Sequence, residues 1–197
     1  MRQREMSTAS QPAREARKDG AIHVCPLSAV PDTVARSKAS HLLTWLQDEI
    51  VVETPRLILP ERHIRFHIHD ISEPLPGYVQ PGREHIDQLI EFALDWGGRG
   101  PIVVHCWAGI SRSTAAAYTA LCALNPEVPE ELIARRLREA SPTAYPNRLI
   151  IRLADDALGR RGRMVRAVES IGRGVIATEA VPFWMHADHS DSVGQPR

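Results

Sequence analysis

One short segment, His105–Ser113, places a cysteine and an arginine at the two ends of a five-residue loop. A cysteine thiolate is a nucleophile, and the planar guanidinium of an arginine can bind two oxygens of a phosphate. The apolar run Pro101–Val104 before the loop predicts a buried strand, and the alanine-rich run Ser113–Leu124 after it predicts a helix buried on most sides. Cys106 therefore stands at the end of a strand, and the loop leads into a helix N-terminus.

A loop in that position is suited to hold an anion. The first N–H groups of a helix lack intrahelical partners, and the helix dipole adds partial positive charge there. The same field favours the thiolate of Cys106, and the Ser113 hydroxyl can hydrogen-bond its sulfur. Gly109 can adopt a positive φ and bring the backbone close to a ligand. The residues expected to bind the phosphate are Trp107, Ala108, Gly109, Ile110, Ser111 and Arg112.

The segment resembles the signature of the cysteine-dependent protein tyrosine phosphatase superfamily, in which His-Cys is followed by five residues and then by Arg and Ser or Thr. His105, Cys106, Arg112 and Ser113 match it. The resemblance implies that Cys106 attacks phosphorus to form a cysteinyl-phosphate, that Arg112 stabilises the equatorial oxygens, and that Ser113 helps the thiolate to leave. It gives His105 a supporting role beside the loop, and it requires no metal or other cofactor.

Two other interpretations of Cys106 are weaker. Most lone cysteines are buried structural thiols, but the surrounding motif favours a nucleophile here. Rhodanese-like domains also carry cysteine–loop–arginine sites, usually without the His-Cys and Arg-Ser pairs that frame this loop. Further along the chain, Arg138, Pro146 and Asn147 loosely match a turn and a Pro-Asn pair that family members often have before a helix behind the loop.

Asp70 is the candidate general acid. A cysteinyl phosphatase needs an acid to protonate the leaving oxygen and then a base to activate water. Alternating apolar residues over 64–68 predict a strand with Asp70 at its end, followed by a turn-rich loop over 72–82. The compact dual-specificity branch of the superfamily has its acid aspartate in a similar place, so the resemblance points to Asp70. Glu73 is the main competitor, and a capping or solvated Asp70 is the structural alternative.

Histidines in the same region allow a metal site as a second interpretation. Alternation places His67 and His69 on one strand face, a spacing that can bind a metal, and His63 and His85 could complete the site. Strand histidines at a sheet edge are more often hydrogen-bonded structural residues. Metal catalysis would also leave the anion-binding loop without a purpose, so we expect no metal.

Strands alternate with helices along the chain, which predicts an α/β fold with a central, mostly parallel sheet flanked by helices. The expected strands are Ala21–Cys25, His41–Leu46, the strand ending at Asp70 and Pro101–Val104, with either a short strand or an irregular connection at Arg56–Leu59. The expected helices are 27–36, 81–96, 113–124, 129–140, 146–158 and 160–171. Ligands of such sheets bind at the carboxyl ends of the strands, where both Asp70 and Cys106 are expected.

The length of 197 residues, with 43% hydrophobic residues, fits one domain. We expect a flexible segment over 1–19, a single phosphatase domain over 20–185 and a disordered tail over 186–197. The resemblance covers 21–158, and 160–185 are expected to form a helical extension. The basic face of its first helix is expected to be solvated, the alternatives being an acidic partner or lipid. The apolar cluster Val181–Met185 is expected to fold back on the domain.

Charge and cysteine usage limit the partners and the compartment. The formal net charge is zero, so there is no bulk attraction to nucleic acid or to an acidic membrane. Three cysteines give no disulfide framework, and a catalytic thiolate needs reducing surroundings, so we expect the cytoplasm. No apolar run approaches the ~20 residues that span a bilayer, and the N-terminus lacks the core of a signal peptide. Arginine far outnumbers lysine, which indicates a GC-rich bacterial genome.

The uncharged loop over 107–111 favours a single phosphate on a protein side chain or a small aryl ester, because phosphoinositide-directed relatives tend to carry lysines there. We expect phosphotyrosine or mixed phosphoprotein substrates. The alternatives are a non-catalytic module that binds phosphorylated partners and a phosphatase of a small soluble phosphate ester. Cys25 or Cys122 could trap an oxidised Cys106 as a disulfide, but both are expected to be core residues.

Overall fold

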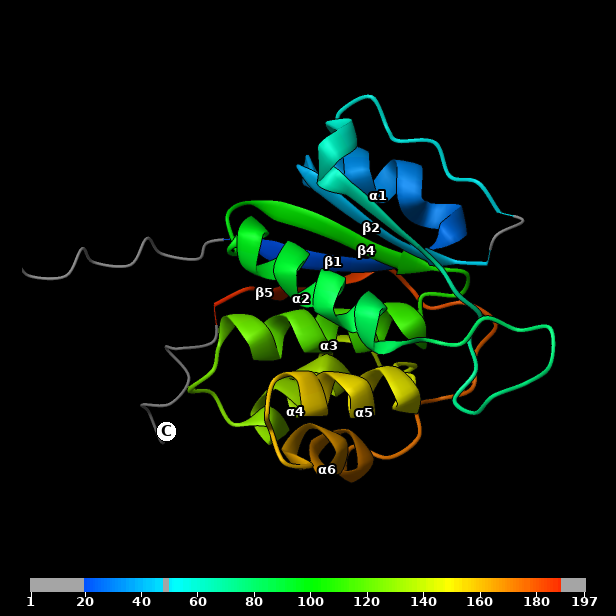
Figure 1. The fold of residues 1–197 in the computed structure, drawn as a ribbon. Coiled ribbons are helices and arrows are strands. Elements are labelled where there is room, and N and C mark those ends of the chain that lie inside the picture. Colours follow the sequence, from blue (N-terminus) through cyan, green and yellow to red (C-terminus); the bar gives the residue numbers. More distant parts are fainter. Residues whose placement is uncertain (1–19, 48–49, 189–197) are drawn as a thin grey trace, which may run out of the picture.

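The computed structural model describes residues 20–47 and 50–188, which fold around one five-stranded sheet (Figure 1). The strands are β1 (Ala21–Pro26), β2 (His41–Leu46), β3 (His63–His67), β4 (Pro101–Cys106) and β5 (Phe183–His186). Their order across the sheet is β3-β2-β4-β1-β5, with the first four parallel and β5 antiparallel to β1. The predicted α/β fold with a mostly parallel sheet is confirmed.

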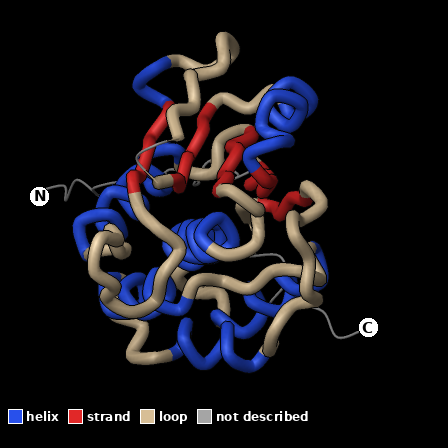
Figure 2. Tube along the Cα trace, turned by 90° about the vertical axis from the view of Figure 1, so that its right-hand side faces the viewer, coloured by secondary structure: helices blue, strands red, loops and turns tan. Residues whose placement is uncertain are grey.

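Helices cover both faces of the sheet, but unequally. They are α1 (Val30–Ser37), α2 (Arg83–Trp96), α3 (Arg112–Leu124), α4 (Glu130–Ala140), α5 (Arg148–Ala157) and α6 (Arg163–Ser170), with short 3₁₀ turns at Leu27–Ala29 and Pro60–Arg62. The group α2–α6 lies on one side, and α1 lies on the other (Figure 1). Figure 2 shows the strands as a layer between these two groups.

The alternation of side chains along the strands separates two cores. Val104 and Cys106 of β4 belong to the large core beneath α2–α6, whereas Val103 belongs to the small core beneath α1. Because β4 is buried on both faces, its sequence is a continuous apolar run. Helix α3 occupies the centre of the large core, where every residue except Ala123 is buried. Its small alanines allow the neighbouring helices to pack closely.

The C-terminal part differs from the prediction. Residues 160–185 are not all helical, because α6 ends at Ser170 and the chain continues in extended form to β5. Phe183 and Met185 are buried and Trp184 is half-exposed, as on an edge strand with one buried face. The predicted disordered tail was wrong at its start, since His186 belongs to β5 and Ala187 donates its N–H to the Gly20 carbonyl. The predictions for 1–19 and 189–197 lie outside the described residues.

One further boundary is corrected, and one open alternative is decided. The third strand ends at His67 rather than at Asp70, since only the Ile68 N–H still bonds to the neighbouring strand, at the Leu46 carbonyl. Residues 56–59 form an irregular connection, which is the second of the two alternatives. Among the described residues, no helix has the length and apolar character needed to cross a membrane.

Candidate active site

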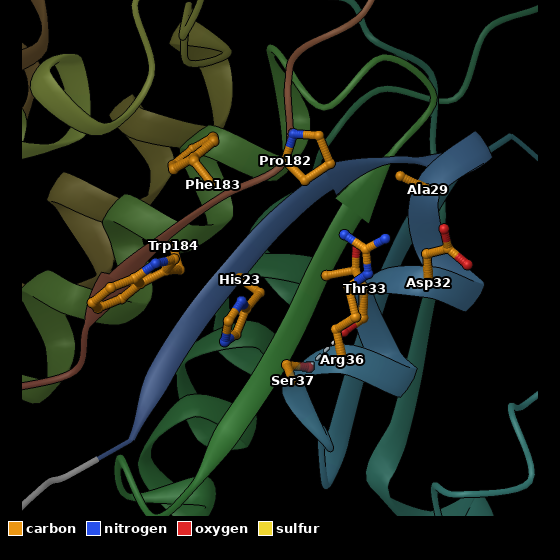
Figure 3. Close-up of a pocket in the computed structure, with 9 residues that line it drawn as sticks. All are labelled: His23, Ala29, Asp32, Thr33, Arg36, Ser37, Pro182, Phe183 and Trp184. Carbon is orange, nitrogen blue, oxygen red and sulfur yellow. Dashed lines mark hydrogen bonds between the residues drawn. The ribbon is translucent and has the colours of Figure 1, made fainter.

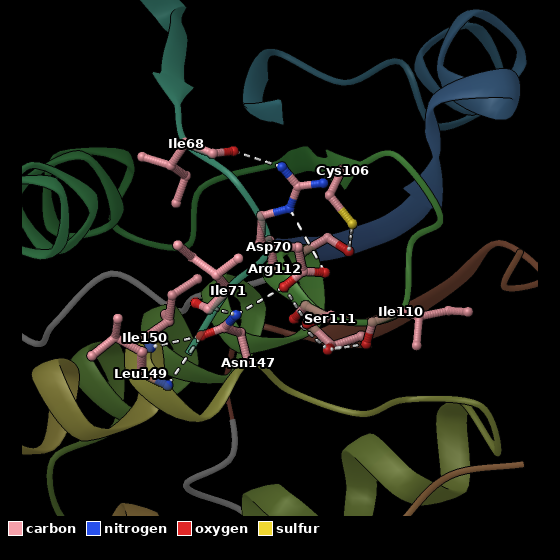
Figure 4. A network of polar contacts seen from close by, with 12 residues as sticks. Ile68, Asp70, Ile71, Cys106, Ile110, Ser111, Arg112, Asn147, Leu149 and Ile150 are labelled. Carbon is pink, nitrogen blue, oxygen red and sulfur yellow. Dashed lines mark hydrogen bonds and ion pairs between the residues drawn. The ribbon is translucent and has the colours of Figure 1, made fainter. Parts of the chain in front are cut away.

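The end of β4 and the start of α3 enclose a short loop, residues 107–111, here called the Cys106 loop. Cys106 is the last residue of β4 and is almost fully buried. Its Sγ lies 3.2 Å from Oγ of Ser113 in the first turn of α3 (Figure 4). The predicted strand–loop–helix arrangement is therefore present, with the hydroxyl in hydrogen-bonding distance of the sulfur.

The carbonyl groups of the Cys106 loop are bound from outside. The bonds run from Leu27 N–H to Trp107 (3.0 Å), from Ala180 N–H to Ala108 (2.8 Å), from Tyr145 N–H to Ile110 (3.0 Å) and from Asn147 N–H to Ser111 (3.3 Å). The C=O and N–H of a trans peptide point in opposite directions, so these bonds turn the following N–H groups toward the interior of the loop. Among the described backbone bonds of loops and turns, none uses an N–H of this loop as donor. The donors remain available for an anion.

Gly109 permits this loop conformation. Its φ is +72°, and an added Cβ would lie 2.8 Å from the Cys25 carbonyl carbon. A side chain at this position would meet both backbone strain and a clash with β1. The expected positive φ of Gly109 is confirmed, and the close approach that the structure shows is to the backbone of β1.

Arg112 is buried at the start of α3 and reaches the segment that follows β3. Its Nη1 donates to the Ile68 carbonyl at 2.7 Å, and its Nε lies 3.9 Å from Oδ2 of Asp70. That Nε is buried and has no hydrogen-bond acceptor. A buried donor without an acceptor is costly, and an oxyanion in the neighbouring cavity would satisfy it.

Asp70 lies in the loop that connects β3 to α2, here called the 68–82 loop. Its Oδ1 accepts hydrogen bonds from Ser111 Oγ and from Asn147 Nδ2, both at 2.8 Å (Figure 4). The Oδ1 of Asn147 accepts from the N–H groups of Leu149 and Ile150, so the same side chain caps α5. Asp70 is thereby held between the Cys106 loop and α5.

The contact between Asn147 and Asp70 was not predicted from the sequence. The available signal was the Pro146-Asn147 pair before a helix, which identifies an N-cap but not a second partner 77 positions away. The partner depends on how the 68–82 loop folds back over α5, and no local pattern encodes that.

A cavity of about 520 Å³ opens over Cys106. Its lining residues are Gln47, Asp70, Cys106, Trp107, Ala108, Ile110, Ser111, Arg112, Ala177 and Thr178. The structure thus brings Asp70 and Cys106 to one cavity, as predicted, although Asp70 lies in the loop after β3 and not at the end of the strand. Glu73 is exposed and is not among the lining residues. Ala177 and Thr178 come from the C-terminal extension, whose contribution to the site was not predicted from the sequence.

His105 begins a buried chain of hydrogen bonds on the α1 face of the sheet. Its Nε2 lies 2.7 Å from Thr44 Oγ1, which lies 2.8 Å from Nε2 of His63. Nδ1 of His63 contacts Thr54 Oγ1 at 2.9 Å, and Arg65 donates to that hydroxyl at 2.7 Å. Burial lowers the pKa of His105 to about 4 and that of His63 to about 3. Both imidazoles are therefore neutral near pH 7.

One set of tautomers satisfies the whole chain. The Cys106 carbonyl can only accept, so Nδ1 of its neighbour His105, at 3.4 Å, carries the proton. Nε2 of His105 then accepts from the Thr44 hydroxyl, which accepts from Nε2–H of His63. This leaves Nδ1 of His63 to accept from the Thr54 hydroxyl, whose oxygen accepts from Arg65. The arrangement fits the supporting role expected of His105 and is incompatible with a base that accepts a proton at either nitrogen.

The histidines considered as metal ligands do not share one strand face. The strand ends at His67, and His69 lies beyond it, where its Nδ1 accepts the Val79 N–H at 3.0 Å. His85 accepts the Gly82 N–H at 2.9 Å. No group of three or more His, Cys, Asp or Glu residues suited to a metal occurs in the described part of the chain. The predicted alternation failed because β3 is shorter than expected.

Cys25 and Cys122 are poorly placed to trap an oxidised Cys106. In the β1–β4 register Cys25 is paired with His105, so its side chain lies on the opposite face of the sheet from Cys106. Burial raises the pKa of Cys25 to about 12 and also raises that of Cys122. Cys122 lies in α3 ten residues after Arg112, or ~15 Å along the helix axis. Both are core residues, as predicted.

A second cavity, of about 300 Å³, lies between α1 and the β1–β5 edge of the sheet (Figure 3). Its lining includes His23, Asp32, Arg36 and Trp184, and it contains no cysteine. It therefore lacks the combination of a cysteine and a buried arginine that lines the first cavity.

Comparison with known proteins supports the fold. No family model and no curated protein matches the sequence. Among solved structures, DUSP15 has a TM-score of 0.55 and 17% identity over 78% of this chain and 95% of its own. PTP-2 phosphatase of Cydia pomonella has a TM-score of 0.55 and 15% identity over 85% and 96%. PTPMT1 in complex with PI(5)P has a TM-score of 0.55 and 13% identity over 75% and 97%.

Proposed function

We propose that this chain, whose fold is that of the compact dual-specificity and protein tyrosine phosphatases, hydrolyses phosphomonoesters through a cysteinyl-phosphate intermediate. The observation that carries the proposal is the Cys106 loop itself. Four of its carbonyls are bound from outside, and the buried Arg112 Nε has no hydrogen-bond acceptor. Such an array of inward donors around a cysteine stabilises a phosphoryl group in transfer.

In the first step, Cys106 Sγ attacks phosphorus and the bond from phosphorus to the leaving oxygen breaks. The loop N–H groups and Arg112 hold the equatorial oxygens. The leaving oxygen takes a proton from Asp70, for which Oδ2 is the suitable atom, because Oδ1 is occupied by Ser111 and Asn147.

In the second step, water attacks phosphorus and the sulfur–phosphorus bond breaks. Asp70 accepts the proton from the water, and inorganic phosphate leaves. The Ser113 hydroxyl, 3.2 Å from the sulfur, donates a hydrogen bond to the departing thiolate. No step needs a metal.

The substrate class follows from the lining of the cavity. The loop side chains are uncharged, so a second phosphate beside the first would find no cation among them. Trp107 is half-exposed at the cavity, where it can contact an aromatic ring. These features support phosphotyrosine, with phosphoserine or phosphothreonine as further substrates of a dual-specificity enzyme.

The three described cysteines are free, and a catalytic thiolate requires reducing surroundings. We therefore also propose the cytoplasm as the site of action.

The test is hydrolysis of a simple aryl phosphate in EDTA and reductant by the wild type and by Cys106→Ser. We expect turnover in the wild type and none in the variant. Cys25→Ser is the matched control, because it makes the same change on the other face of the sheet and should retain activity. Turnover that survives in Cys106→Ser would contradict the nucleophile. Phosphopeptide binding without turnover in the wild type would instead indicate a non-catalytic module.

A further inference from the structure

The segment from Gly172 to Ala180, here called the C-terminal strap, runs across the outer side of the Cys106 loop. It is fastened along its length. Arg138 Nη2 donates to the Gly172 carbonyl (3.0 Å), Val175 N–H to Pro142 (2.9 Å), Ser28 Oγ to Glu179 (2.9 Å) and Ala180 N–H to Ala108 (2.8 Å). Because these contacts are spread along the segment, they fix the backbone on both sides of its one cationic residue, Arg173.

A cavity of about 290 Å³ lies between the strap and residues 143–145, and is here called the Arg173 pocket. It shares Ile110 and Ala177 with the cavity over Cys106, so the two are neighbours along one surface. Its other lining residues are Thr143, Tyr145, Arg173, Gly174, Val175 and Ile176. A substrate that places its phosphate at Cys106 can therefore extend directly into this pocket.

Arg173 is the one charged residue of the pocket lining. Its guanidinium carbon lies 5.4 Å from the centre of the Tyr145 ring, which orients the planar group. Among the described residues no carboxylate pairs with it, whereas Arg160 and Arg163 both pair with Glu130. Arg173 thus presents hydrogen-bond donors and an unneutralised charge to the pocket.

We propose that the Arg173 pocket binds an anionic side chain of the substrate, next to the phosphorylated residue held at Cys106. The ligand is a carboxylate or a second phosphate, since both offer the paired oxygens that a guanidinium binds in two-point fashion. The proposal rests on the proposed phosphatase function and adds the substrate preference: phosphopeptides with an acidic neighbour. The apolar walls from Ile110 and Val175 would contact the stem of that side chain.

The test compares phosphotyrosine peptides that carry one glutamate or one glutamine within three residues of the phosphotyrosine. The quantity is the ratio of kcat/KM for the two peptides within each protein, so that any general loss of activity cancels. We expect the wild type to favour glutamate by about three- to tenfold at one position, as for a partly exposed charged pair. In Arg173→Met, which keeps the apolar stem, the ratio should fall to about one.

Arg152→Met is the matched control, because Arg152 is an exposed arginine of α5 outside both cavities and should retain the wild-type ratio. A wild-type ratio of one at every position, or a preference that survives Arg173→Met, would overturn the proposal. Replacing the preferred glutamate by phosphoserine identifies the anion. An increase in kcat/KM that depends on Arg173 supports a second phosphate as the ligand, and a decrease that depends on Arg173 supports a carboxylate.

Binding of the same peptides to Cys106→Ser, followed by fluorescence anisotropy, separates this proposal from the phosphatase function. If no protein turns over any peptide but glutamate still tightens binding through Arg173, the pocket is supported and the hydrolytic function is wrong. If turnover occurs and the ratio is one, the hydrolytic function is supported and the proposed role of the Arg173 pocket is wrong. Failure of all phosphopeptides to bind overturns both.

Discussion

The Cys106 loop and the 68–82 loop supply the two halves of the candidate site, and they are held in different ways. Four backbone N–H groups from three separate segments bind carbonyls of the Cys106 loop. The 68–82 loop has internal bonds, between His69 and Val79 and between Tyr78 and Leu75, and is exposed at its tip. Its contacts with the rest of the site are made by side chains, through Asp70 and Arg112.

The two loops are therefore suited to different tasks, charge stabilisation and proton donation. A cradle that stabilises a developing charge works best when its dipoles are fixed in advance, because nothing then has to reorganise during the reaction. A proton donor must reach leaving groups of different size, so a loop held by a few side-chain bonds suits that task. Changes in the Cys106 loop should therefore cost more activity than changes in the attachment of the 68–82 loop.

The largest effect is expected from Arg112→Lys. Lysine keeps the charge but cannot bind two oxygens at once or reach the Ile68 carbonyl with the same fork. We expect kcat/KM for an aryl phosphate to fall by about a thousandfold, comparable to the loss of a preorganised oxyanion donor. A loss of less than about tenfold would show that the backbone cradle alone stabilises the transferred group.

Asp70→Asn comes next. An amide keeps the shape and still contacts Ser111 and Asn147 but cannot deliver a proton, so kcat should fall by about a hundredfold. The loss should shrink when the leaving group is a weaker base. Glu73→Gln is the matched control, and we expect wild-type rates because Glu73 is exposed outside the cavity. The opposite pattern in the two variants would transfer the acid role to Glu73.

Asn147 tests the attachment of the 68–82 loop. Asn147→Ala removes both the bond to Asp70 and the cap of α5, and should lower the free energy of unfolding by about 1 kcal/mol. Asn147→Ser restores a cap acceptor but not the amide donor. We expect Asn147→Ser to recover stability in urea titrations while kcat stays about tenfold low, as when a catalytic group loses its orientation. Equal recovery of both would limit Asn147 to a capping role.

The histidine chain behind Cys106 is expected to have the smallest effect on activity, and its consequence is a pH dependence of stability. Burial lowers the pKa of His105 to about 4 and of His63 to about 3, so between pH 6.5 and these values the unfolded chain binds protons that the folded protein does not. The free energy of unfolding should therefore have its full value above pH 6.5 and fall by about 2 kcal/mol per histidine as the pH is lowered to 5. Urea midpoints of His63→Gln should lose about half of this pH dependence, and an unchanged dependence would contradict the neutral chain.

The difference between the Cys106 loop and the 68–82 loop also explains which parts of the candidate site could be predicted from the sequence. The residues proposed as the nucleophile, the anion-binding arginine and the assisting hydroxyl all lie within His105–Ser113, so local geometry and one contiguous motif place them. Asp70 is the proposed acid because of the family resemblance and its position after a strand, although that strand ends earlier than predicted. Asn147 and Thr44 act through partners far away in the chain, which a local pattern cannot show.

The fold follows a similar rule. The four parallel strands were predicted because each is an apolar or alternating run of five or six residues. β5 was missed because it has four residues, follows a proline and alternates over only two buried positions. This strand matters for the candidate site, because its pairing with β1 places the preceding C-terminal strap beside the Cys106 loop.

Rapid mixing of Ser113→Ala with an aryl phosphate is the decisive test for the proposed cysteinyl-phosphate. Loss of the Ser113 hydroxyl should slow the breakdown of the cysteinyl-phosphate more than its formation, so we expect a burst of the phenol product followed by slow turnover. Mass spectrometry of the acid-quenched protein should then find one phosphoryl group on the peptide that contains Cys106. A linear time course with no phosphoryl group on that peptide, in a protein that still hydrolyses the substrate, would contradict a cysteinyl-phosphate intermediate.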